Sequence, residues 1–476
     1  MVNKLGRLMN WEKVYRGMVY ILPGVLCFSY YPVIVLGGSE SMNFELSLPL
    51  IWLVVFNVVV LTLMLKKRKL VEGMKGKWWW LLFPGFLSIS VAWSLNPVRG
   101  VLTGGILWLV YFAIYGMWSL RGLLSEVGFK DKFWKVFFGS YLVVCAWCVV
   151  QCVMDLAGAG RDVSLMCAGC TYRMFGFPHP NGFAIEPQFM GNLLLAPAIV
   201  SIWMAMKKKK YYWLVFVFAA GIFLTFSRGA IYAFAVATIF MVTMEMVRQK
   251  TWRFCKTFMV VALAFLCVLG VQGMMAAMGP TDDTFGSGVA KVLNHLSLGI
   301  IDIRKAGKNG DGVEANGQTI EGTEEEEENY KVEKAVFDGY VEESTETRVK
   351  LSSEAVEAWK GNLGTVIGGV GLGGAGQALY MEGLSDSPKE IVQNEYVSLL
   401  LETGMIGVVL MMLTVVLIVR VVIKSKAMTM LLALMVAYGI TLMFFSGLPN
   451  ALHIYLLTGF FIVLSRDSLL SNSIAV

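Results

Sequence analysis

Charged residues are scarce in this sequence: they make up 16% of its 476 residues, against 57% apolar ones. A soluble domain usually carries about a quarter charged residues, so the composition excludes an ordinary soluble globular protein. Histidine is scarcer still, with three in the whole chain and no HExxH or paired-histidine motif. That scarcity argues against a histidine metal centre. The phosphate-binding pattern GxxxxGK[ST] is also missing, which argues against ATP as an energy source.

Other metal and nucleotide motifs are incomplete. Cys167 and Cys170 form one CxxC without a second pair, which indicates a local disulfide or free thiols rather than zinc. Gly371, Gly373 and Gly376 match GxGxxG, but no βαβ unit surrounds them. The net charge of +6 is spread over short loops and gives no sign of a nucleic-acid partner. The sequence therefore predicts no metal and no cofactor.

What the chain does have is a series of apolar runs of about 17–25 residues, each long enough to cross a hydrocarbon core of about 30 Å. Backbone groups in lipid must be satisfied within the span, so each run is expected to be a helix. We predict an all-α polytopic membrane protein with about twelve transmembrane helices and one long outer loop. The expected spans are residues 18–38, 47–65, 78–95, 100–120, 134–156, 182–205, 211–227, 229–247, 257–278, 400–420, 427–446 and 450–465.

Clusters of Lys and Arg predict the orientation. With these spans every cluster falls on one side of the membrane, which is the cytoplasmic side by the positive-inside rule. The clusters are Lys4/Arg7/Lys13/Arg16, Lys66–Lys69, Lys130/Lys132/Lys135, Lys207–Lys210, Arg248–Lys256 and Arg420/Lys424/Lys426. Both termini are thus expected in the cytoplasm. Met1–Arg16 has no signal-peptide cleavage pattern, so the first span is expected to remain as an anchor.

Three regions follow from this topology. Residues 1–278 form an N-terminal transmembrane region, 279–399 a large periplasmic or extracellular loop, and 400–476 a C-terminal transmembrane region. The loop contains the acidic run Glu324–Glu328. Because like charges repel and stay solvated, we expect residues 306–345 to be flexible.

The second part of the loop changes character. Arg348 to Lys360 carries apolar residues at helical spacing, namely Val349, Leu351, Val356 and Trp359. This pattern predicts an amphipathic helix that lies against the membrane-side core.

Arginines on the expected outer side are exceptions to the charge bias. Arg173, Arg228 and Arg348 lie at outer membrane edges, where a charge is costly unless it faces a cavity or a partner. A guanidinium offers a planar fork of donors that suits phosphate oxygens. The open alternative is a lipid-headgroup contact or a salt bridge to one of three acidic residues, Glu186, Glu395 and Glu402.

Four motifs occur in a fixed order along the chain. Arg173 precedes Phe175-Gly176 and Pro180-Asn181, and Ser227-Arg228-Gly229-Ala230 forms a turn between two spans. Further motifs complete the order: Arg348 to Trp359 followed by Gly369-Val370-Gly371-Leu372-Gly373, and Gln393-Asn394-Glu395-Tyr396 followed by Glu402-Thr403-Gly404-Met405-Ile406-Gly407. Over about residues 170–465, the chain resembles the O-antigen ligase / O-antigen polymerase (Wzy-type) family of bacterial envelope membrane proteins.

This resemblance implies a fold related to the C-class glycosyltransferases. It also implies an enzyme of the inner membrane that uses an undecaprenyl-diphosphate-linked oligosaccharide and a glycan or other hydroxyl acceptor, without ATP or an obligatory metal. A chain-length regulator or another envelope glycan protein would be a partner. Charge builds on the diphosphate as it leaves, so fixed cations there would stabilise the transition state.

Roles for individual residues follow from the resemblance and the chemistry. Arg228 and Arg348 would stabilise the leaving diphosphate, with Arg173 as a third contact. The backbone N–H groups of Gly369, Gly371 and Gly373 would contact the same oxygens, and Gln393 and Asn394 would hydrogen-bond to sugar or phosphate. A general base would be Glu395 or Glu186. Glu402 would pair with an arginine.

Gln393 departs from the family pattern. Ligases of the family have a histidine before the asparagine, and glutamine cannot take a proton near neutral pH. We therefore favour a repeat-unit polymerase. The alternatives that stay open are an O-antigen ligase, a protein O-oligosaccharyltransferase, a non-enzymatic transporter of lipid-linked glycans, and a structural or sensor membrane protein.

Overall fold

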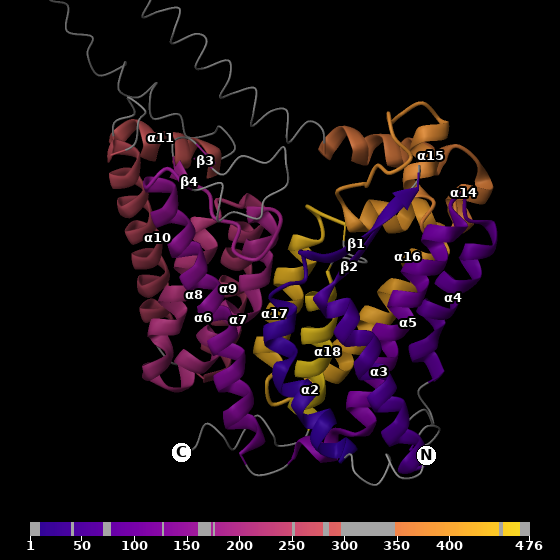
Figure 1. Cartoon of the computed structure of the whole chain (residues 1–476), viewed down its shortest axis with the longest axis horizontal. Coiled ribbons are helices and arrows are strands. Elements are labelled where there is room, and N and C mark those ends of the chain that lie inside the picture. The colour runs from indigo at the N-terminus through magenta and orange to yellow at the C-terminus, as the bar shows by residue number, and fades with distance from the viewer. Residues whose placement is uncertain are drawn as a thin grey trace, which may run out of the picture.

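A computed structural model describes residues 10–39, 42–69, 78–125, 128–159, 173–174, 177–249, 253–278, 285–296, 348–446 and 451–466. These residues form a bundle of helices with small hairpins and short helices gathered at one end (Figure 1). The acidic segment 306–345 and the Cys167/Cys170 motif lie outside the described residues.

The helices follow one another in three groups. The first comprises α2 (Trp11–Leu26), α3 (Leu48–Lys66), α4 (Leu82–Ser90), α5 (Pro97–Ser119) and α6 (Phe129–Leu156), with the 3-10 turns η2 (Trp78–Leu81), η3 (Val91–Trp93) and η4 (Arg121–Leu124). The second comprises α7 (Pro187–Lys207), η5 (Lys209–Tyr211), α8 (Tyr212–Leu224), α9 (Arg228–Gln249), α10 (Arg253–Met278) and α11 (Phe285–Leu296). The third comprises residues 348–360, α14 (Leu363–Gly368), α15 (Ala375–Met381), α16 (Glu395–Ile423), α17 (Met428–Thr441) and α18 (Leu452–Arg466).

Each of the twelve expected spans contains a helix, which confirms the all-α polytopic membrane fold. In the described part of the chain, seven helices are long and apolar enough to cross a membrane by themselves. They are Leu48–Lys66, Pro97–Ser119, Phe129–Leu156, Pro187–Lys207, Arg228–Arg248, Cys255–Met275 and Glu395–Ile423. Shorter apolar helices occupy Trp79–Trp93, Met428–Thr441 and Leu452–Ser465.

The expected first span, 18–38, is wrong in its position. Helix α2 begins at Trp11, where Asn10 caps it by accepting a hydrogen bond from the Lys13 N–H at 3.1 Å. It ends at Leu26, and the residues from Pro32 onward form β1 (Pro32–Ser39), which pairs antiparallel with β2 (Met42–Ser47). A proline disfavours helix in the residue before it, and the β-branched run after Pro32 suits a strand.

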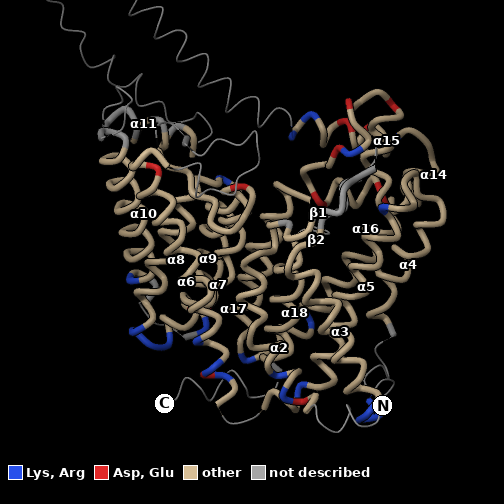
Figure 2. The backbone as a smooth tube through the Cα atoms, viewed as in Figure 1, with Lys and Arg blue, Asp and Glu red and all other residues tan. Residues whose placement is uncertain are grey.

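Basic residues gather at one end of the bundle (Figure 2). At this end Lys67 forms an ion pair with Glu12 at 2.7 Å, and Lys66 lies over the Trp11 ring. Helices α7 and α9 both end here, at Lys207 and Gln249. The loops that the sequence assigns to the cytoplasm therefore lie together.

Helix α7 forms the centre of the bundle. In its apolar window 94% of the residues are buried, and it packs against α8, α9 and α17. Helix α16 contrasts with it, since only 17% of its window is buried inside the protein. A span with so little protein around it lies at the rim, where its apolar side chains face lipid.

The predicted amphipathic helix of the outer loop is present at residues 348–360. Its buried face consists of Leu351, Ala355 and Ala358, which are 7%, 0% and 2% exposed. Ala355 and Ala358 belong to a small second core with Val370, Ala375, Ala378, Leu379, Val392 and Leu401. The expected apolar face was partly wrong, because Val349 is 62% exposed.

Candidate functional site

A cavity of about 810 Å³ opens at the end of the bundle away from the basic residues. The ends of several helices meet there. Arg228 is the first residue of α9, Thr441 is the last of α17, Gln188 is the second of α7, and Asn394 caps α16. This volume falls in the range of about 300–1,000 Å³ that small-molecule sites occupy.

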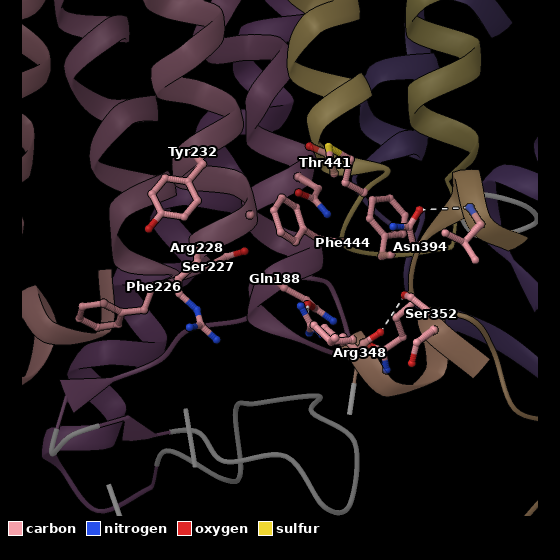
Figure 3. A pocket seen from close by; sticks show the side chains of 18 of the residues that line it. Gln188, Phe226, Ser227, Arg228, Tyr232, Arg348, Ser352, Asn394, Thr441 and Phe444 are labelled. Carbon is pink, nitrogen blue, oxygen red and sulfur yellow. Dashed lines mark hydrogen bonds between the residues drawn. The ribbon is translucent and has the colours of Figure 1, made fainter. Parts of the chain in front are cut away.

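The Arg228 side of the cavity is shaped by the turn between α8 and α9. Phe226 has φ +47°, a left-handed conformation that is unusual for a bulky residue and is often found at functional sites. Ser227 caps α9 through a hydrogen bond from the Ala230 N–H to its Oγ at 3.4 Å. The turn thereby places Arg228 at the first helical position, where Figure 3 shows its side chain in the pocket.

Two histidines that the sequence analysis set aside lie beside this turn. Nε2 of His179 hydrogen-bonds to the Thr225 carbonyl, and Nε2 of His295 to the Phe226 carbonyl at 3.4 Å. A carbonyl can only accept, so Nε2 carries the proton in both rings. Burial, and next the nearby Arg228 charge, lower the pKa of His295 to about 3. Among the described residues, no three His, Cys, Asp or Glu side chains gather to hold a metal ion.

Arg348 enters the cavity from the start of the outer-loop helix. Its Nη2 donates to Oε1 of Gln188 at 2.9 Å, and Nε2 of Gln188 donates to the Glu186 carboxylate. In Figure 3, Arg228, Gln188 and Arg348 lie along the same edge of the pocket. Two guanidinium groups from distant parts of the chain thus line one cavity, as the sequence analysis expected of a phosphate-binding site.

Gln393 and Asn394 also line the cavity. Asn394 Oδ1 accepts hydrogen bonds from the N–H groups of Tyr396 and Val397 at 3.1 and 3.3 Å, and so caps α16. This cap uses the side-chain oxygen, so the amide nitrogen is the atom with which Asn394 can donate to a ligand.

The two expected bases do not line the cavity. Glu186 precedes α7, and its carboxylate accepts a hydrogen bond from Nε2 of Gln188, which does line the cavity. Glu395 is the first residue of α16, and its carboxylate accepts a hydrogen bond from Ser446 Oγ at 3.3 Å. Its backbone N–H donates to the Leu442 carbonyl at 2.9 Å. Glu395 therefore joins α16 to the segment after α17.

The glycine run lies away from the cavity and connects elements of the fold. Gly371 N–H donates to the Glu402 carbonyl at 2.9 Å, and Leu372 N–H donates to Ser90 Oγ at 3.3 Å. Gly371 has φ +86°, and a Cβ there would meet the Ser94 backbone. Gly369 and Gly373 share this loop.

Glu402 lies beside the same loop. The Gly373 and Ala375 N–H groups hydrogen-bond to its carboxylate, which also interacts electrostatically with Arg99. Helix α16 breaks two residues later at Gly404, with φ +59°. We assign these residues a structural role in holding α14, α15 and α16 together.

Arg173 lies in β3 (Arg173–Met174), which pairs antiparallel with β4 (Phe177–Pro178). The Arg173 backbone is opposite Pro178, directly before His179 of the cavity. Its side chain lies outside what the structure describes.

One side of the outer-loop helix completes the cavity, and the sequence analysis missed it. We call this side the cavity face of residues 348–360; it consists of Val349, Ser352, Ser353, Val356, Glu357 and Lys360. These positions recur at the i, i+3, i+4 spacing of one helical face. Recognising Leu351, Ala355 and Ala358 as the core side would have revealed it.

Fold and site together define a polytopic helical membrane protein with an arginine-lined polar cavity at one end of its bundle. Residues 213–412 match the family model of the O-antigen ligases. This match supports the O-antigen ligase/polymerase family, and with it a glycan-handling membrane function of the kind that this family has. The matched region includes Arg228, the outer-loop helix and the start of α16. No curated protein matches the chain.

Proposed function

We propose that this protein is a membrane glycosyltransferase that polymerises undecaprenyl-diphosphate-linked oligosaccharide repeat units on the outer face of the inner membrane. One observation carries the proposal: Arg228 and Arg348 line the same cavity, at the end of the bundle away from the basic loops. By the positive-inside rule, that end faces outward.

The two guanidinium groups suit the leaving group of the reaction. When the bond between the sugar and the diphosphate breaks, negative charge grows on the phosphate oxygens. Cations that are already in place stabilise that charge without reorganisation. A guanidinium also donates along two parallel directions, which matches the spacing of phosphate oxygens. Gln188 keeps the Arg348 fork oriented through its 2.9 Å hydrogen bond.

The location of the cavity favours an enzyme over a transporter of the same lipid. Transporter sites lie near the bilayer midplane and are built from discontinuous helices of paired repeats. Here Gln188, Arg228, Asn394 and Thr441 all lie at helix ends on one side of the bundle. A reaction at the membrane surface fits this arrangement.

Purified protein in detergent, supplied with lipid-linked oligosaccharide extracted from membranes of the producing cells, tests the proposal. A polymerase converts the extract into a ladder of longer products on a gel, without ATP. A single transfer to lipid A-core or to a protein acceptor would instead identify a ligase or a protein O-oligosaccharyltransferase. Movement of the lipid across proteoliposomes without any product would identify a transporter.

A further inference from the structure

The hydrogen-bonding groups of the cavity differ between the two arginines and the later turns of the outer-loop helix. Arg228 and Arg348 can only donate hydrogen bonds, because a guanidinium has no acceptor atom. Beyond Arg348, the cavity face of residues 348–360 carries two serines and one glutamate, and Lys360 adds one donor at its far end. The directions of the hydrogen bonds within that helix decide what this face offers a ligand.

Both serine hydroxyls use their protons within the helix. Ser352 Oγ donates to the Arg348 carbonyl at 2.7 Å, and Ser353 Oγ donates to the Lys350 carbonyl at 2.8 Å. A hydroxyl has one proton and two lone pairs, so each Oγ is left to accept hydrogen bonds. These two residues therefore present hydrogen-bond acceptors to the cavity.

Glu357 adds a carboxylate to the same face. Among the described residues that line the cavity, Glu357 alone carries a carboxyl group. It lies one helical turn beyond Ser353, so both side chains project from the same side of the helix. An ionised carboxylate only accepts hydrogen bonds, so three neighbouring side chains all require donors from a ligand.

We infer that the cavity face of residues 348–360 binds the hydroxyl groups of the glycosyl acceptor, and that this acceptor is a glycan. The inference rests on the proposed function and names the other half of its site. Anionic phosphate oxygens bind the donating arginines, and sugar hydroxyls, which can each donate one hydrogen bond, bind Ser352, Ser353 and Glu357.

The length of the helix fits this division. Arg348 and Glu357 are nine positions apart, which corresponds to about 13 Å along the helix axis. The helix thus separates the phosphate contacts at its start from the glycan contacts further along. A sugar ring carries several hydroxyl donors close together, so one glycan residue can reach neighbouring acceptors on this face.

Steady-state transfer with purified full-length variants tests the inference. The donor is the extracted lipid-linked oligosaccharide, and the acceptor is the same oligosaccharide on a short synthetic lipid. Ser352→Ala removes one hydrogen-bond acceptor and should raise the KM for the acceptor about two- to tenfold. The KM for the donor should stay within about twofold of the wild-type value.

Substitutions at Glu357 provide a graded test. Glu357→Gln keeps one acceptor oxygen, Glu357→Leu keeps none, and Glu357→Lys replaces the carboxylate by a donor. The KM for the acceptor should rise in that order. Glu354→Gln is the matched control, because Glu354 is on the same helix, outside the cavity, and pairs with Lys350 at 3.8 Å.

The outcomes separate the two proposals. Wild-type protein that makes no product overturns the proposed function and this inference with it. If the wild-type protein transfers normally, two results would overturn the inference alone. Either the Ser352 and Glu357 variants keep the wild-type KM for the acceptor, or only their KM for the donor changes. Transfer to a Ser/Thr peptide but not to the oligosaccharide also overturns it.

Discussion

Arg348 and Gln188 are 160 residues apart in sequence, yet Nη2 of Arg348 donates to Oε1 of Gln188 at 2.9 Å. The bond joins the start of the outer-loop helix to the second residue of α7, the most buried span. The acceptor in this bond is a neutral amide, which fixes the direction of one guanidinium N–H. The bond therefore helps to orient Arg348 at the edge of the cavity.

Gln188→Leu should lower the transfer rate about tenfold. Leucine fills similar space, but it leaves a partly buried guanidinium donor without this partner, which costs about 1–3 kcal/mol. Product ladders from purified protein give the measurement. Lys350→Gln, an exposed residue of the same helix that lies outside the cavity, is the control and should behave as wild type. Normal activity of Gln188→Leu would show that Arg348 needs no orientation by α7.

Arg228→Lys and Arg348→Lys should each reduce transfer about a hundredfold, since the loss of one transition-state contact is worth about 3 kcal/mol. Lysine keeps the charge but lacks the planar fork. The rate should fall at saturating donor as well as at low donor, because the contact strengthens as the diphosphate leaves. If both variants make near-normal polymer, the arginines bind lipid headgroups instead.

Gly404→Ala should destabilise the protein by about 1 kcal/mol or more. Gly404 has φ +59°, and a Cβ there would meet the Ile367 backbone, which cannot move aside easily. Thermal unfolding in detergent, followed by tryptophan fluorescence, measures the effect. Gly105→Ala is the control, because Gly105 is in α5 with no neighbour within 4 Å of a Cβ. Equal unfolding temperatures for the two variants would contradict the assigned role of the kink.

The proposed orientation can be checked with cysteine labelling in intact cells. Ser344→Cys, in the outer loop, should react with a membrane-impermeant maleimide. Native Cys255 is exposed near the start of α10, on the basic side, and should react only after the cells are opened. The reverse order of labelling would invert the topology and place the cavity in the cytoplasm.

Stability should fall in mild acid because of His295. Burial lowers its pKa to about 3, against about 6.5 for an exposed histidine. Between these values the unfolded chain binds a proton that the folded one does not, so stability decreases as the pH drops, by at most about 1.4 kcal/mol per pH unit. Between pH 7 and pH 5, the unfolding temperature of His295→Gln should decrease less than that of the wild-type protein. Equal losses would show that His295 does not titrate in this way.

Hydropathy predicted the spans well because lipid leaves a chain little choice of structure. The exception is instructive: residues 18–38 are apolar, but Pro32 and the β-branched residues after it end the helical region at α2 and start a hairpin. Hydropathy measures whether a segment avoids water. It does not distinguish a strand from a helix.

The arginines could be predicted to lie at the end opposite the basic loops, because each conflicts with the charge bias of the spans. The position of Glu357 could not, since an exposed acid on a soluble helix looks like any solvated residue. Which face of that helix meets the cavity depends on the packing of Ala355 and Ala358 against a distant core. Glu395 and Glu186 showed the opposite problem, because both lie near the helix ends that form the cavity but do not line it.

The cavity is assembled from the middle and the last part of the chain: Arg228 lies near the middle of the sequence, whereas Asn394, Thr441 and Phe444 are made near the end. During synthesis, the growing chain inserts its first spans long before the last part of the cavity leaves the ribosome. Chains that stop before α17 lack a wall of the cavity. Such fragments would occupy the membrane without the proposed activity.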